Sequence, residues 1–247
     1  PIASSAASDV YKRQIITSNY MSFKDIFNID AEVKESAHAR VNLIGEHTDY
    51  TGGYVMPTLL SFKNTIEISQ NNSNEFTVYS QHFKEKKTFN DFKKSINNEW
   101  VDYIKGCLHI FFDENKISSR FLNIFISSDI PLERGISSSS ALCVATLKAL
   151  NTFFETKIKD PEIAKLAKKV EFNYIGVSGG IMDQMVSSIG IHGKAFFMNC
   201  KNLEYELINF PENWKFCLID SEVQRNLRDS SYTVSYTHLT LPTRLLV

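Results

Sequence analysis

The chain has 247 residues, of which 43% are hydrophobic and 22% charged, so it can bury a sizeable core and is not disordered as a whole. Its 27 basic and 28 acidic residues give a net charge of −1, which offers no electrostatic case for nucleic acid or an anionic membrane as the main partner. No run of about 18 apolar residues and no basic-then-apolar leader occurs, so we expect a cytoplasmic protein without a membrane span.

The two ends differ in character from the chain between them. Residues 1–20 open with a small, polar stretch without periodicity, and residues 235–247 continue no helix or strand pattern. Both resemble translated cloning or adaptor sequence, so we expect a non-native or disordered leader and a non-native tail. Flexible native termini are the alternative. Met21 is then the expected native start, and the native segment is expected to end near Val234.

Helix and strand patterns follow one another irregularly in the middle, which favours an α+β fold over a doubly wound sheet. Alternation of apolar and polar residues predicts strands at 64–70 and 75–80, joined as a hairpin by a turn at 71–74. Asp160 is the expected cap of a helix that has Pro161 in its first turn. The other predicted strands are 37–44, 121–127, 194–199, 203–208 and 216–219, and the predicted helices are 99–112, 141–154, 160–176 and 181–189.

Four cysteines stand far apart, at positions 107, 143, 200 and 217, and no CxxC spacing occurs. A disulfide framework or a zinc ribbon needs closer or paired cysteines. We therefore expect buried free thiols in a reducing compartment.

The first motif with chemical content is ARVNLIGEHTDYTGGYVMP, residues 39–57. Glu46, His47 and Asp49 lie in a glycine-containing loop, and such acceptors suit paired hydrogen bonds from adjacent sugar hydroxyls. Arg40, on the strand before the loop, suits the stabilisation of phosphoryl charge. The alternatives are a tight solvated turn and a metal site, although the helical His spacing of a zinc enzyme is missing.

The second motif is PLERGISSSSA, residues 131–141, between a predicted strand and a predicted helix. Its glycine and four serines offer backbone N–H groups and hydroxyls at a helix start, which suits a polyphosphate. The spacing fits neither a Walker loop nor a serine-hydrolase elbow. A helix cap is the alternative function of such a serine run.

The third motif is EFNYIGVSGGIMDQ, residues 171–184. Glu171 stands near the end of one predicted helix, and Asp183 near the start of the next, after a glycine-rich loop. A carboxylate in that position can reach into a cleft as a base or hydroxyl acceptor. The alternative for Asp183 is a helix cap.

Together the three motifs resemble those of the galactokinase family within the GHMP small-molecule kinases. RVNLIGEHTDYTGG resembles the galactokinase signature, the serine loop resembles the ATP-binding motif, and GGIMDQ resembles the segment with the catalytic aspartate. The resemblance runs from about Met21 to Val234. It implies an α+β N-terminal domain, with a mixed sheet packed with helices, expected at 21–200. It also implies a second α+β domain, whose truncated start is expected at 201–234.

The resemblance implies transfer of the ATP γ-phosphoryl group to the 1-hydroxyl of galactose, with Mg²⁺ as cofactor. Asp183 resembles the residue that accepts the hydroxyl proton, and Arg40 the arginine that stabilises the transition state. The implied sugar ligands are Glu46, His47, Thr48, Asp49, Gly180 and Tyr232. The implied ATP contacts are Ser80, Glu133, Arg134, Gly135, Ile136, Ser137, Ser138 and Ser139, and the implied Mg²⁺ ligands are Ser139 and Glu171.

The chain departs from the family pattern at three places. Glu133 stands where the phosphate loop has glycine, and a like charge about 4 Å from phosphate costs on the order of 4 kcal/mol. Ser235 and Tyr236 stand where an arginine pair is expected, and a later glycine-rich motif has no counterpart. We therefore expect a fragment with little or no activity. A sister kinase acting on N-acetylgalactosamine or arabinose, and a non-catalytic galactose and ATP sensor, are the alternatives.

Overall fold

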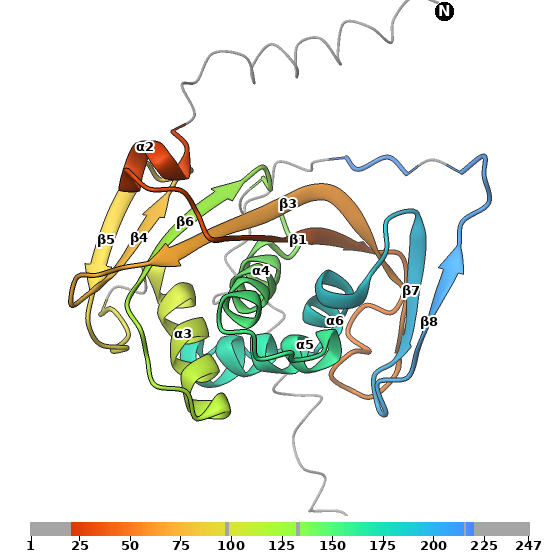
Figure 1. The fold of residues 1–247 in the computed structure, drawn as a ribbon. Coiled ribbons are helices and arrows are strands. Elements are labelled where there is room, and N and C mark those ends of the chain that lie inside the picture. Colours follow the sequence, from red (N-terminus) through yellow and green to blue (C-terminus); the bar gives the residue numbers. More distant parts are fainter. Residues whose placement is uncertain (1–20, 97–98, 132–133, 215, 220–247) are drawn as a thin grey trace, which may run out of the picture.

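The computed structural model describes residues 21–96, 99–131, 134–214 and 216–219, which form one mixed sheet with helices α3 to α6 packed on one face (Figure 1). The strands are β1 (Val33–Asn42), β2 (Tyr54–Val55), β3 (Pro57–Gln70), β4 (Phe76–Ser80), β5 (Glu85–Phe89), β6 (Leu122–Ser128), β7 (Lys194–Asn199) and β8 (Tyr205–Asn209). The helices are α2 (Phe23–Phe27), α3 (Val101–Asn115), α4 (Ser138–Phe153), α5 (Asp160–Lys169), the π-helical turn η1 (Val170–Ile175) and α6 (Met182–Ile189). Within these described ranges, no helix is long and apolar enough to cross a membrane.

The strand order shows that the predicted hairpin is wrong. The sheet runs β2-β7-β3-β6-β4-β5, with β1 paired to β3 and β8 paired to β7, so β6 separates the two strands of the predicted hairpin. β6 pairs antiparallel with β3, where Ile66 faces Ile126, and parallel with β4, where Val78 faces Ile124. Every residue of β4 is buried, which suits an interior strand, whereas β5 takes the outer position.

Several predicted boundaries also change. β3 begins seven residues before the predicted strand at 64–70, and α4 begins at Ser138, inside the serine run. Lys159, and not Asp160, occupies the cap position of α5, with Asp160 as its first helical residue. The predicted helix at 160–176 continues as η1 after α5, and residues 216–219 form no strand. β8, which lies beyond the domain boundary expected at residue 200, extends the same sheet through β7.

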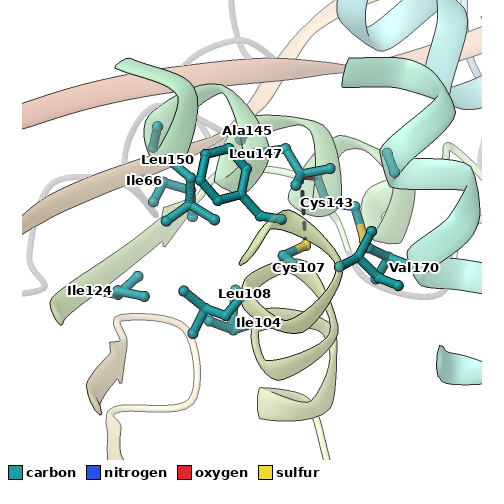
Figure 2. Packing of buried hydrophobic residues seen from close by; sticks show 14 of the residues in the cluster. Ile66, Ile104, Cys107, Leu108, Ile124, Cys143, Ala145, Leu147, Leu150 and Val170 are labelled. Carbon is teal, nitrogen blue, oxygen red and sulfur yellow. Dashed lines mark hydrogen bonds between the residues drawn. The ribbon is translucent and has the colours of Figure 1, made fainter. Parts of the chain in front are cut away.

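Helix α4 forms the centre of the core between the sheet and the other helices (Figure 2). Leu147 and Leu150 of α4 are fully buried with Ile66 and Ile124 of the sheet, in the same cluster as α3. Full burial of one such side chain contributes about 1.5–3 kcal/mol. Cys107 and Cys143 are buried free thiols, as predicted, with Cys107 Sγ 3.8 Å from the carbonyl oxygen of Cys143. Cys200 is half-buried, and Cys217 is exposed, so the prediction of a buried thiol is wrong for Cys217.

A glycine lets α3 pack closely against η1, the segment that carries Glu171. A Cβ atom added at Gly106 would lie 2.8 Å from Cδ1 of Tyr174 and 3.0 Å from Cγ1 of Val170. The Tyr174 ring has little freedom to move, because its hydroxyl donates to the carbonyl oxygen of Phe92 at 2.5 Å. The distance between α3 and η1 is therefore set by the absence of a side chain at position 106.

We predict that Gly106→Ala lowers the melting temperature, even though alanine is the better helix former by about 1 kcal/mol. Overpacking costs about 1–3 kcal/mol, so the net loss should be about 1 kcal/mol, or about 2–4 °C for a domain of this size. Thermal unfolding followed by circular dichroism measures the change. Asp113→Ala, at an exposed position of the same helix, is the control and should be neutral. A melting temperature that rises with Gly106→Ala would contradict this packing.

Candidate active site

A bulge in β1 precedes the central arginine of the site. The β1–β3 register shifts between His38 and Arg40, and a bulge of this kind re-aims the side chain beside it. Arg40 then reaches Asp183 at the start of α6 in a bidentate pair, with Nε donating to Oδ1 at 2.6 Å and Nη2 donating to Oδ2 at 2.8 Å. The side chains are 14% and 26% exposed, so the pair is largely shielded from solvent.

The serine loop is tied to the same pair. Arg40 Nη1 donates to the carbonyl oxygen of Gly135 at 3.1 Å, and Ser137 Oγ donates to Asp183 Oδ2 at 2.6 Å. Gly135 and Ser137 both have left-handed backbone angles, with φ of 71° and 63°, which bend the chain sharply into α4. The carbonyl oxygen of Ser138 accepts a hydrogen bond from Asn64, and that of Ile136 from the backbone N–H of Arg40. The loop is thus fixed to both β1 and β3.

The acidic loop after β1 is held by its own side chains. Asn42 Nδ2 donates to Glu46 Oε1 at 2.9 Å, and His47 Nδ1 lies 2.7 Å from the hydroxyl of Tyr50. Thr48 Oγ1 lies 2.7 Å from the carbonyl oxygens of both Gly45 and Tyr54, so this hydroxyl closes the loop. Glu46 and His47 are exposed, so a molecule in solution can reach both side chains.

Asp49 joins this loop to the glycine turn before α6. A Cβ atom added at Gly180 would lie 2.0 Å from Asp49 Oδ2, so only glycine allows this approach. Burial raises the pKa of Asp49, and the negative charge of Asp183 raises it further. Burial lowers the pKa of Arg40, but the charge and hydrogen bonds of Asp183, with the charges of Glu46 and Asp49, leave that pKa above its usual value. Asp49, Arg40 and Asp183 therefore form one electrostatic unit, with Gly180 packed against Asp49.

Glu171, in η1, is 6% exposed and is influenced electrostatically by Asp183. Burial raises the pKa of its carboxyl group. The negative charge of Asp183 raises this pKa further. The donor groups of Ser139, Gln184 and Ser140 lower it and offset part of the rise. Ser139, one of the two predicted metal ligands, therefore acts on the pKa of the other, Glu171, while the hydrogen bonds to the Glu171 carboxylate come from Ser140 and Gln184. A hydroxyl and a carboxylate are oxygen donors of the kind that Mg²⁺ prefers.

Sequence reasoning missed Lys168 of α5. Its ammonium group donates to the carbonyl oxygen of Gly179, next to the glycine that meets Asp49. Burial lowers the pKa of Lys168, while the charges of Glu171, Asp49 and Asp183 oppose the shift. The sequence did contain a signal for this position. Lys168 lies four residues after the apolar Ala164, and this helical spacing predicts that both residues face the protein interior.

Not every predicted residue joins the cluster. Ser80 ends β4, where its hydroxyl accepts a hydrogen bond from the backbone of Phe83 at 3.4 Å. Arg134 is in the described part of the serine loop, whereas Glu133 and Tyr232 lie outside the described residues. Across the part of the chain that is described, no group of three or more His, Cys, Asp or Glu side chains is arranged to hold a metal ion. A metal with only Ser139 and Glu171 as protein ligands depends on other oxygen atoms to complete its coordination.

Two family models match the chain over the segments that build this site. The N-terminal domain of the GHMP kinases matches residues 102–190, and the galactokinase galactose-binding signature matches residues 21–70. The galactokinase of Pyrococcus furiosus is 36% identical over 203 residues, covering 82% of this chain and 56% of that protein. That of Thermotoga petrophila is 35% identical over 201 residues, covering 81% and 56%. The chain thus spans a little over half the length of these curated relatives.

Solved structures confirm the α+β fold. The galactokinase of Lactococcus lactis, in complex with galactose, matches with a TM-score of 0.77 at 27% identity, over 94% of this chain and 59% of that chain. The mevalonate kinase of Methanococcus jannaschii matches with a TM-score of 0.61 at 23% identity, over 72% of this chain and 56% of that chain. At that identity the likeness concerns the fold alone.

We predict that Asp49→Asn raises the melting temperature by a few degrees at neutral pH. The raised pKa means that the fold favours the protonated carboxyl group, so the contribution of Asp49 to stability is largest at low pH and is lost as the pH rises through the raised pKa. The neutral amide removes this loss. The gain should therefore disappear as the pH falls and Asp49 itself becomes neutral.

Thermal melts of both proteins across acid to neutral pH measure the difference. Asp113→Asn, at an exposed position, should show no such gain. A gain that stays constant with pH would show that the charge of Asp49 is not its cause.

Proposed function

We propose, from the premise that this chain belongs to the GHMP kinase family and carries its galactokinase signature, that the protein phosphorylates galactose with ATP. The products are galactose 1-phosphate and ADP. The observation that carries the proposal is the Arg40–Asp183 pair, because it joins the sugar-signature strand, the serine loop and the glycine turn at one point. The whole protein's activity stays a proposal, since the chain covers 56% of its curated relatives.

In the proposed reaction, the oxygen of the 1-hydroxyl attacks the γ-phosphorus of ATP. The new bond joins that oxygen to phosphorus, the bond between the γ-phosphorus and the β,γ-bridging oxygen breaks, and ADP leaves with the electron pair. The hydroxyl proton passes to Asp183. Oδ2 of Asp183 accepts from both Arg40 and Ser137, whereas Oδ1 accepts from Arg40 alone, so Oδ1 has the greater free acceptor capacity. We assign proton acceptance to Oδ1.

Arg40 would stabilise the charge that develops on the transferring group. A guanidinium has five N–H donors, and three of those of Arg40 bond Asp183 and Gly135. The remaining two, on Nη1 and Nη2, bond no side chain or carbonyl among the described residues and would be available for phosphoryl oxygens. The bonds already made would hold the guanidinium in one orientation, which is what makes electrostatic stabilisation effective.

The serine loop from Glu133 to Ser139 would hold the phosphates of ATP. Ser139 and Glu171 would hold Mg²⁺. When bound, Mg²⁺ neutralises phosphate charge and orients the terminal phosphates. The hydroxyl and carboxylate oxygens of these two residues suit it, and Ser139 directly precedes Ser140, which contacts Glu171. Ser80 would contact the nucleotide, as the family resemblance implies.

The sugar would be bound by Glu46, His47, Asp49 and the turn at Gly180. Thr48 would hold their loop in shape. Tyr232, which lies outside the described residues, would also contact the sugar. Carboxylates accept hydrogen bonds from hydroxyls, and the exposed positions of Glu46 and His47 support access. The fixed distance between Asp49 and Gly180 would limit the space around the sugar. We place the reaction in the cytoplasm, because the free thiols of Cys107 and Cys143 suit a reducing compartment.

The test is a transfer assay with the purified chain, Mg-ATP and one sugar at a time. Galactose, N-acetylgalactosamine and arabinose are compared, and sugar phosphate is detected by chromatography. Binding of galactose and of an ATP analogue is measured in parallel by calorimetry. Product with galactose alone, even at low turnover, supports the proposal, and product with another sugar assigns a sister kinase. Because we expect little or no turnover from this chain, binding of both ligands without product fits an inactive fragment as well as a sensor.

We predict that Asp183→Asn reduces product formation by at least about 10²-fold, because the amide cannot accept the proton. Binding of the ATP analogue should change little, since Asp183 bonds the loop through Ser137 and Arg40 rather than a phosphate. Asp129→Asn, at an exposed position outside the site, is the control. Equal, detectable turnover of Asp183→Asn and the unchanged chain would refute the role of Asp183.

A further inference from the structure

A buried polar cluster holds the carboxylate of Glu171. Ser140, at the start of α4, is 3% exposed, and Gln184, in the first turn of α6, is also 3% exposed. Ser140 Oγ lies 3.0 Å from Glu171 Oε2 and 3.2 Å from Oε1, so one hydroxyl spans both carboxylate oxygens. Gln184 Nε2 donates to Oε2 and also lies 3.3 Å from Ser140 Oγ. Each of the three side chains therefore contacts both of the others.

The orientation of the Gln184 amide is set by Glu171. Its Oε1 atom is buried and has no hydrogen-bond partner among the described residues. An unpaired buried carbonyl is unfavourable, yet rotating the amide by half a turn would place Oε1 against a carboxylate oxygen. The amide thus keeps its N–H groups towards Glu171 at the expense of its own oxygen. The Glu171 carboxylate is therefore contacted at both oxygens, whereas one polar atom of Gln184 has no partner in the described part of the chain.

In two places near Glu171, a residue of the proposed reaction is directly followed in sequence by a residue that contacts Glu171. Ser139 and Ser140 are neighbours at the start of α4, and Asp183 and Gln184 are neighbours at the start of α6. In each pair the first residue belongs to the proposed reaction, whereas the second contacts Glu171. The first turns of the two helices therefore set the position of Glu171 relative to the reacting groups.

We propose that Ser140 and Gln184 are positioning residues that hold the Glu171 carboxylate in the orientation needed to bind Mg²⁺. The inference rests on the proposed function, in which Glu171 is a metal ligand. Both donors bond Oε2, which leaves Oε1 with more lone-pair capacity for a metal ion. Partners of this kind fix the geometry of a ligand, and their loss typically weakens metal binding by about 10–100-fold.

The first experiment measures the Mg²⁺ concentration needed for half-maximal binding of a fluorescent ATP analogue to the chain. Ser140→Ala and Gln184→Met should each raise this concentration by about 10-fold, with little change in binding without Mg²⁺. Ser140→Thr keeps the hydroxyl and should restore the original value. Ser188→Ala is the matched control, since Ser188 is a buried serine of α6 whose hydroxyl donates to the carbonyl oxygen of Asp160.

An unchanged Mg²⁺ requirement in both variants, with a stability loss like that of Ser188→Ala, would overturn the inference and leave a purely structural role. Because the two variants remove different donors, failure of one to fold leaves the other as the test. Circular dichroism establishes the folding of each.

A second experiment separates this inference from the proposed function. Urea unfolding of Ser140→Ala, Glu171→Ala and the double variant should show non-additive effects, since the two side chains interact directly. The same cycle with Ser188→Ala should be additive. Additive effects in the first cycle would overturn the contact between Ser140 and Glu171. Non-additive effects combined with nucleotide binding that needs no Mg²⁺ in the unchanged chain would uphold the contact and refute the metal role of Glu171.

Discussion

The bidentate pair between Arg40 and Asp183 is the interaction on which the rest of the site depends. It joins residues separated by 143 positions and connects β1 to the start of α6. The third bond of Arg40 and the hydroxyl of Ser137 bring the serine loop to the same point. Removing one partner of a buried pair costs about 3–5 kcal/mol, because the other charge is left uncompensated. The pair thus acts on both the assembly of the site and its chemistry.

Repulsion between carboxylates is the second electrostatic feature of the site. Burial raises the pKa values of Asp49 and Glu171, and the negative charge of Asp183 raises both further. Lys168 and Arg40 offset only part of this negative charge. Donor groups that arrive from solution, such as sugar hydroxyls, or a cation beside Glu171, would reduce the repulsion further. A ligand of either kind would therefore stabilise this arrangement of acceptors.

The sequence predicted local features well and long-range ones poorly. The patterns around Leu147 and Phe196 located α4 and β7, because periodicity reports which face is buried. They could not show that β6 separates β3 from β4, since alternation carries no information on partners. Three motifs led to Arg40, Asp49 and Asp183, although no local pattern gave their distances. The contacts of Ser140, Gln184 and Lys168 went unpredicted, because each depends on helices brought together by the tertiary fold.

The π-helical turn at Val170–Ile175 makes the orientation of Glu171 depend on the number of residues as well as on their identity. Such a turn accommodates one residue more than an α-helical turn does. Deleting a single residue there would allow a regular α-helical turn and would change which side chains of the segment face the site. The place of Glu171 opposite Ser140 and Gln184 would then depend on which residue was removed. A deletion in this segment is therefore a more severe change than a substitution at one of its exposed positions.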